Sequence, residues 1–129
     1  MMRNLIVSLF LLIPLAACSQ KAEVKQTTVD QLSQVDYLQD DNIIVLDVRT
    51  AQEVNEGRIA GSQHADVLRT DEFTMNVAKL DKDKTYYVIC RSGGRSSKAA
   101  GMMKDMGFKN IYNVQGGMTA WQNKQLPVE

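Results

Sequence analysis

A strand, a glycine-rich loop and a helix follow one another near the middle of the sequence, and this unit constrains the fold most. The β-branched and aromatic run at 85–88 predicts a buried strand, and the segment 98–103 predicts a helix. The loop between them contains Cys90, Arg91, Ser92, Gly93, Gly94, Arg95 and Ser96. Cys90 is therefore expected where a strand ends and a helix begins, at the edge where parallel sheets bind ligands.

The loop has the composition of an anion cradle. Two adjacent glycines let the backbone curl tightly, so that successive N–H groups can point at one spot, and the helix behind adds the positive end of its dipole. A cysteine placed there is stabilised as the nucleophilic thiolate, with Arg91 and Arg95 adding charge. A buried structural cysteine beside a plain turn is the alternative, but the combined features favour a nucleophile. Gly93 stands where a Cys-x-x-Cys redox motif needs its second cysteine.

Alternating strands and helices are predicted on both sides of this unit. The continuous apolar run 43–48 indicates a strand covered on both faces, as parallel strands are, and 111–114 indicates another short strand. Because 129 residues with 44% hydrophobic side chains suffice for one core, the pattern predicts a single α/β domain with a mainly parallel sheet.

Two capping boxes mark the starts of helices. Thr28 with Gln31 opens one helix, and Thr50 with Glu53 opens a second, so the simplest role of Glu53 is to cap. Helical spacing places three apolar side chains on the first of these helices: Leu32, Val35 and Leu38.

The first 17 residues have the pattern of an export signal and not of a folded element. One positive charge precedes an apolar stretch at 5–15, which is too short to span a membrane, and small residues lead to Cys18. This order resembles the bacterial lipoprotein signal, so residues 1–17 are expected to be cleaved and Cys18 to carry lipid. Residues 18–27 would then be a polar tether, with the domain at 28–129. An ordinary export signal near a cysteine is the alternative.

The same interpretation predicts location and partners. Ser19 after the lipidated cysteine would, in a Gram-negative host, direct the protein to the outer membrane facing the periplasm. Cleavage would remove one of the 15 basic residues and none of the 15 acidic ones, so the chain stays close to neutral. Nucleic acid is therefore not an expected partner, whereas small molecules or proteins are. Cys90 would be the only free thiol, which excludes an internal disulfide.

His64, the only histidine, has no partner nearby in the sequence that would make it catalytic. We therefore expect it to be structural. The methionines at 102, 103 and 106 fit the apolar face of a helix, so they are interpreted as core side chains and not as metal ligands.

From about Thr28 to Val128 the chain resembles a single rhodanese domain. The matching pieces, in order, are Asp47-Val48-Arg49 with Glu53, the segment 57–62, the loop 90–96 and the segment 116–121. Two departures are Arg58-Ile59-Ala60, where the family often has His-Ile-Pro, and Asp66, where proline is common.

The resemblance implies a rhodanese-like α/β fold, a five-stranded parallel sheet flanked by helices on both faces, and thiosulfate sulfurtransferase activity. Cys90 would take a sulfane sulfur from a donor such as thiosulfate, hold it as a persulfide and pass it to cyanide or a thiol. Backbone N–H groups from Arg91 through Arg95 would cradle the persulfide, and both arginines would attract the anionic donor. Asp47, with Arg49 and Ser96, would support the loop, although a cap or an ion pair would equally explain Asp47. No metal or organic cofactor is implied, since the chemistry needs only a nucleophilic sulfur and an anion cradle.

Three other functions stay open at this point. A phosphatase or arsenate reductase of related fold needs a Cys-x5-Arg loop, and the spacing from Cys90 to Arg95 is one residue short. A non-catalytic rhodanese-like binding module normally lacks the cysteine. A persulfide carrier that serves a protein partner is compatible with every motif.

Overall fold

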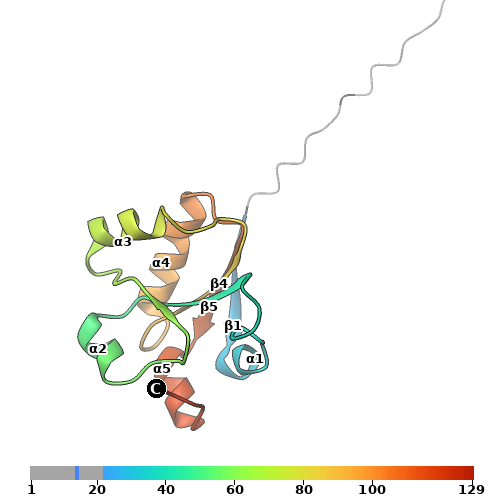
Figure 1. Ribbon diagram of the computed structural model, residues 1–129. Coiled ribbons are helices and arrows are strands. Elements are labelled where there is room, and N and C mark those ends of the chain that lie inside the picture. Colours follow the sequence, from blue (N-terminus) through green and yellow to red (C-terminus); the bar gives the residue numbers. More distant parts are fainter. Residues whose placement is uncertain (1–13, 15–21) are drawn as a thin grey trace, which may run out of the picture.

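The computed structural model describes Pro14 and residues 22–129, and the latter segment forms an α/β fold around one sheet (Figure 1). The elements within 22–129 are β1 (Val24–Thr28), α1 (Val29–Ser33), β2 (Ile43–Asp47), α2 (Ala51–Asn55), β3 (Gln63–His64), α3 (Thr70–Val77), β4 (Thr85–Ile89), α4 (Gly94–Asp105), β5 (Asn110–Gln115) and α5 (Gly117–Asn123).

The sheet has five strands in the order β1-β5-β4-β2-β3, and every neighbouring pair is parallel. The five-stranded parallel sheet expected from the sequence is therefore confirmed. β4 lies in the middle, with Val88 opposite Leu46 of β2 on one side and opposite Asn113 of β5 on the other. Because all strands run the same way, the loop that begins at Cys90 emerges at the carboxyl edge of the sheet.

Side chains of β4 alternate between two cores. Tyr86 and Val88 belong to a cluster that packs under α3 and α4, and Ile89 belongs to a second cluster that contains side chains of α1 and α5 (Figure 1). Both faces of a parallel sheet must be covered, because its strands expose apolar side chains on each side. The helices on both faces confirm the expected layer order.

The segment expected to be a polar tether corrects the sequence-based domain boundary. Residues 24–27 form most of β1, which pairs with β5 along its length. An edge strand has only one neighbour and needs few apolar side chains: Val24 is half-buried, Thr27 is buried, and the polar residues between them face solvent. The folded unit therefore includes residues before Thr28.

The first helix is shorter than its apolar spacing predicts. Both capping boxes are present, at Thr28 and at Thr50, but α1 ends at Ser33. Turns then lead to β2, and Leu38 is left exposed. Leu32 is fully buried, so one turn of helix provides the packing against the sheet.

The expected signal at residues 1–17 and the expected lipid attachment at Cys18 fall in the part of the chain that the structure does not describe, apart from Pro14. Within the described residues, no helix has both the length and the apolar character that a membrane crossing requires.

Candidate active site

The loop after β4 wraps around the sulfur of Cys90. This side chain is 1% exposed, and the N–H group of Gly93 donates a hydrogen bond to its Sγ at 3.0 Å. Gly93 is also the N-cap residue of α4. Its φ is 111°, a backbone conformation that residues other than glycine rarely adopt. Gly94, the second glycine of the pair, is the first residue of the helix. The curled backbone expected from the sequence is present.

The surroundings of Cys90 shift its pKa in opposing directions. Burial is the largest single influence and raises the pKa of the thiol. The hydroxyl of Ser96 and the N–H groups of Ser96, Gly93 and Ser92 all favour the thiolate, and together they outweigh burial, so the pKa of Cys90 is lowered. The sulfur is thus a better nucleophile at neutral pH than an ordinary cysteine.

The start of α5 holds the outer side of the loop. The N–H groups of Met118 and Thr119 donate to the carbonyls of Cys90 and Arg91 at 2.8 and 2.9 Å. A Cβ atom on Gly117 would lie 2.4 Å from the carbonyl oxygen of Cys90, so only glycine fits there. Because these carbonyls point towards α5, the N–H groups of the loop are left to face the sulfur.

The two arginines of the loop differ in their surroundings. Arg95 forms a two-armed ion pair with Glu53, with Nη1 at 2.8 Å and Nη2 at 2.9 Å from its carboxylate oxygens. The hydrogen bonds from Arg95 are the main reason that the pKa of Glu53 falls to about 2. Arg91 is 70% exposed, and its Nη2 lies at the longer distance of 3.6 Å from the same carboxylate. Arg95 is therefore bound to Glu53, and Arg91 is the freer cation.

Asp47 and Arg49 form a buried ion pair with an Nη2 to Oδ2 distance of 2.7 Å. Arg49 also donates to the carbonyls of Glu53 and Gly57, which fixes the helix that carries Glu53. Within residues 22–129, Asp47 has no side-chain hydrogen bond to the loop 90–96. The ion-pair alternative for Asp47 is the one observed, and any support for the loop passes through Glu53.

His64 lies on the edge strand β3 and contacts backbone. Its Nε2 is 2.7 Å from the carbonyl oxygen of Arg49. This contact agrees with the structural role expected from the sequence.

Two residues of this region, Asn113 and Gln26, were not predicted from the sequence. The hydroxyl of Ser96 lies 2.6 Å from Oδ1 of Asn113, a buried residue of β5, and the Nδ2 of Asn113 donates to Oε1 of Gln26 on β1 at 2.9 Å. Their separation in the sequence leaves no local motif, so only the strand pairing brings them together.

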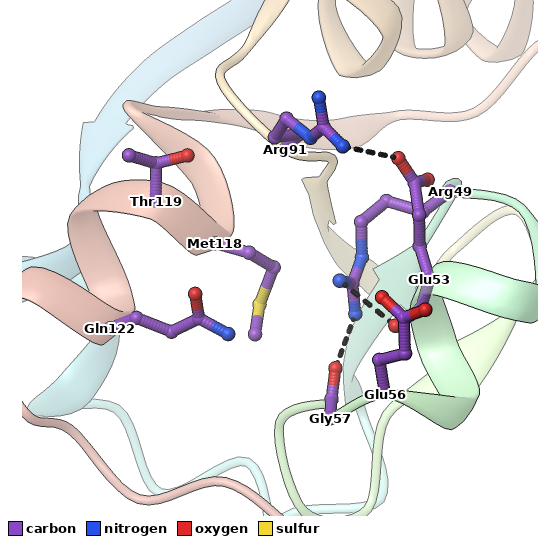
Figure 2. Close-up of a pocket in the computed structure, with 8 residues that line it drawn as sticks. All are labelled: Arg49, Glu53, Glu56, Gly57, Arg91, Met118, Thr119 and Gln122. Carbon is purple, nitrogen blue, oxygen red and sulfur yellow. Dashed lines mark hydrogen bonds and ion pairs between the residues drawn. The ribbon is translucent and has the colours of Figure 1, made fainter.

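A pocket of about 240 Å³ lies beside the loop (Figure 2). Arg91 borders it from the loop, Met118 and Gln122 from α5, Glu53 from α2 and Glu56 from the C-cap of α2. Its walls carry both signs of charge and one thioether. Among the residues that the structure describes, no cluster of histidine, cysteine and carboxylate side chains could hold a metal ion.

A parallel α/β domain with a buried, low-pKa cysteine in a backbone cradle defines a class of proteins that use a sulfur nucleophile or sulfur carrier. Residues 30–124 match the family described as Rhodanese-like domain, and the chain belongs to this family. The matched range begins after β1.

Relatives with assigned names agree with this membership. The chain is 40% identical over 88 residues to the putative sulfurtransferase YtwF of Bacillus subtilis (strain 168), which covers 68% of this chain and 82% of the relative. It is 34% identical over 89 residues to the thiosulfate sulfurtransferase GlpE of Pseudomonas savastanoi pv. phaseolicola, covering 69% of this chain and 81% of that protein. Both relatives are named as sulfurtransferases.

Solved structures show the same fold. A rhodanese-related protein from Thermoplasma volcanium superposes with a TM-score of 0.66 at 30% identity, over 81% of this chain and 97% of the other. A rhodanese-like domain protein from Staphylococcus aureus gives a TM-score of 0.66 at 31% identity, over 76% and 91%.

Proposed function

We propose that this protein is a sulfurtransferase that carries a sulfane sulfur as a persulfide on Cys90. The observation that carries the proposal is the sulfur itself, buried in a loop whose N–H groups lower its pKa. The donor is thiosulfate or a similar anionic sulfur compound, and the acceptor is cyanide or a thiol, which includes thiols on proteins.

The reaction needs no oxidant or reductant besides donor and acceptor. The Cys90 thiolate attacks the outer sulfur of thiosulfate, a sulfur–sulfur bond forms, and sulfite leaves with the electron pair of the bond that breaks. The acceptor thiolate or cyanide then attacks the outer sulfur of the persulfide, and Cys90 leaves as the thiolate. The N–H groups of the loop stabilise negative charge in both steps without reorganising.

The charges at the rim favour an anionic donor. Arg91, Arg95 and Glu53 together carry one net positive charge, because Glu53, with its pKa near 2, is ionised at neutral pH. Arg91 is exposed beside the pocket of Figure 2, where it can meet a donor before the sulfur does. Donor binding is therefore assigned to Arg91 and the cradle to the backbone.

The same geometry argues against phosphatase or arsenate reductase chemistry. Such an enzyme must enclose a tetrahedral oxyanion and bind it with the arginine that ends the loop. Arg95 is bound by both arms to Glu53, and only four residues separate it from Cys90. Sulfur transfer, which requires room for one additional sulfur atom, fits this smaller loop.

Intact mass spectrometry tests the proposal. Incubation with thiosulfate should add the mass of one sulfur atom to the protein, and cyanide should then remove it. Cys90→Ser should abolish both the mass gain and the transfer. Sulfur transfer retained in Cys90→Ser would exclude this mechanism.

We also propose that Cys18 is lipidated and attaches the protein to a bacterial membrane, the outer membrane in a Gram-negative host. The support is the short apolar segment and the small residues that precede Cys18. Cys18→Ser should release the protein into the soluble fraction with its sulfurtransferase activity intact, because Cys18 precedes the matched range 30–124. Wild-type protein found soluble and without lipid would contradict the proposal.

A further inference from the structure

A series of polar contacts leads from the reactive cysteine, through the buried side chains of Ser96 and Asn113, to the exposed edge strand. Sγ of Cys90 lies 3.4 Å from the Ser96 hydroxyl, that hydroxyl lies 2.6 Å from Oδ1 of Asn113, and the Asn113 amide reaches Gln26 at 2.9 Å. Ser96 is 0% and Asn113 5% exposed. Gln26 belongs to β1, outside the matched family range. The proposed sulfur transfer involves Cys90 and gives no role to these contacts.

The Ser96 hydroxyl has one proton and three neighbours that could accept it. They are Oδ1 of Asn113 at 2.6 Å, the carbonyl oxygen of Gly93 at 3.1 Å and Sγ of Cys90 at 3.4 Å. The contact with Asn113 has the length of a strong O–H···O hydrogen bond, so the proton lies there. A lone pair of Ser96 then faces the sulfur and can accept the S–H of the thiol, so the hydroxyl must break its hydrogen bond with Asn113 before it can donate to the thiolate.

Gln26 fixes which end of the Asn113 amide faces Ser96. The Nδ2 group of Asn113 donates to Oε1 of Gln26, so Oδ1 points at the hydroxyl. If the amide turned over, Nδ2 would donate to Ser96, and the hydroxyl proton would be free to turn to the sulfur.

The free thiolate and the persulfide of Cys90 differ in whether a hydroxyl proton stabilises Sγ. In the free thiolate the charge is on Sγ, where a hydroxyl donor stabilises it. In the persulfide the charge is on the outer sulfur, and Sγ carries none. A hydrogen bond from the hydroxyl to Sγ is therefore favoured after the persulfide has been discharged. The hydrogen bond to Asn113 is favoured again when the persulfide re-forms.

We propose that Asn113 is a positioning residue for the reaction of Cys90: it holds the Ser96 hydroxyl away from the sulfur, and Gln26 keeps it oriented to do so. The inference deepens the proposed sulfurtransferase function. Its test needs no sulfur donor, because cysteine reactivity is measured directly.

Charged groups around the loop do not account for this effect. Arg91, Arg95 and Glu53 form the rim, Asp66 acts on Arg95 through space, and Asp47 pairs with Arg49. Among the described residues, none of these side chains hydrogen-bonds to Ser96 or Asn113. Replacing Asn113 by leucine consequently changes a hydrogen bond without removing a charge.

The experiment is the pH profile of Cys90 alkylation by iodoacetamide, a neutral reagent. Asn113→Leu should react about threefold faster at pH values below the Cys90 pKa, because Asn113 no longer competes with the thiolate for the hydroxyl proton. The lower nucleophilicity of the resulting thiolate limits the gain to this size. The plateau rate at high pH, where the cysteine is fully ionised, should fall by about twofold. In a Ser96→Ala background the same substitution should have no effect.

Two further variants protect the test. Gln26 lies on the exposed edge strand, so Gln26→Leu is expected to fold. It should also accelerate alkylation, but by less than Asn113→Leu does. Asn110→Leu replaces an asparagine on the same strand whose amide contacts the carbonyl of Asp83, and it should leave the profile unchanged.

The outcomes separate clearly. Unchanged or slower alkylation below the Cys90 pKa in folded Asn113→Leu, or an equal acceleration in the Ser96→Ala background, would overturn the positioning role. If Asn113→Leu does not fold, an unchanged profile in Gln26→Leu overturns it instead. A wild-type protein that takes up no sulfur would overturn the proposed function and leave this result standing.

Discussion

The inner wall of the cysteine loop is built from backbone and its outer rim from side chains. The inner wall is backbone: N–H groups of Ser92, Gly93 and Ser96 favour the thiolate. The rim is side chain, where Arg95 is bound to Glu53 and Arg91 is exposed. Backbone donors cannot be removed by one substitution, whereas the rim can be altered without touching the cradle. The comparison predicts that reactivity of the sulfur and affinity for an anionic donor are separable.

The largest effect is expected where the wall is deformed. Gly117→Ala places a Cβ 2.4 Å from the carbonyl oxygen of Cys90 at a φ of 54°, so the loop must shift. We expect about a hundredfold loss of sulfur transfer and a free energy of unfolding lower by ~2–3 kcal/mol. Kinetics and urea unfolding measure both.

Gly101→Ala is the matched control, because nothing lies within 4 Å of its Cβ and it sits inside α4. It should raise the free energy of unfolding by ~0.5–1 kcal/mol and leave transfer unchanged. Normal activity in Gly117→Ala would show that the wall tolerates a shift.

The ion pair between Arg95 and Glu53 in the rim should show in the pH dependence of stability. The pKa of Glu53 is lowered to about 2 from 4.5, mainly by Arg95, so its contribution is complete above pH 4.5 and disappears as pH falls through about 2. Partial exposure limits that contribution to ~1–2 kcal/mol. Urea unfolding of wild type and Glu53→Gln should differ at pH 7 and converge towards pH 2. Curves that stay parallel would mean that the pair adds no stability.

A smaller effect is expected at the exposed rim. Arg91→Gln should raise the KM for thiosulfate about fivefold, equivalent to ~1 kcal/mol for a solvated charge, and added salt should mimic part of it. Alkylation of Cys90 by neutral iodoacetamide should be unaffected. Arg95→Gln should slow both reactions, because Arg95 holds Glu53 as well as contributing charge. Equal losses in both reactions for Arg91→Gln would remove the distinction between rim and wall.

The smallest effect is expected at His64. His64→Asn should form persulfide within about twofold of the wild-type rate across neutral pH, since Nε2 of His64 contacts the Arg49 carbonyl and the loop relies on backbone donors. A large loss of rate in a folded variant would return His64 to the chemistry.

Local patterns predicted much of this molecule, and pairings distant in sequence explain what they did not. The glycine pair, the capping boxes and the strand before Cys90 are signals within a few residues, so they were visible in the sequence. β1 was missed because a strand at the edge can be polar, and only its pairing with β5 identifies it. Glu53 was recognised as a cap, but its ion pair joins residues 42 positions apart.

The parallel sheet also decides what faces the loop. β1 runs alongside β5, with Val24 opposite Ile111 and Thr28 opposite Gln115, so the chain enters the domain at the amino edge and Cys90 lies at the other. Five residues of strand span roughly 16 Å. If the preceding segment bears the lipid proposed for Cys18, the sheet acts as a spacer between the anchor and the persulfide. The loop then opens at the edge of the sheet opposite to the one where the chain enters, which leaves it accessible to a bulky thiol protein.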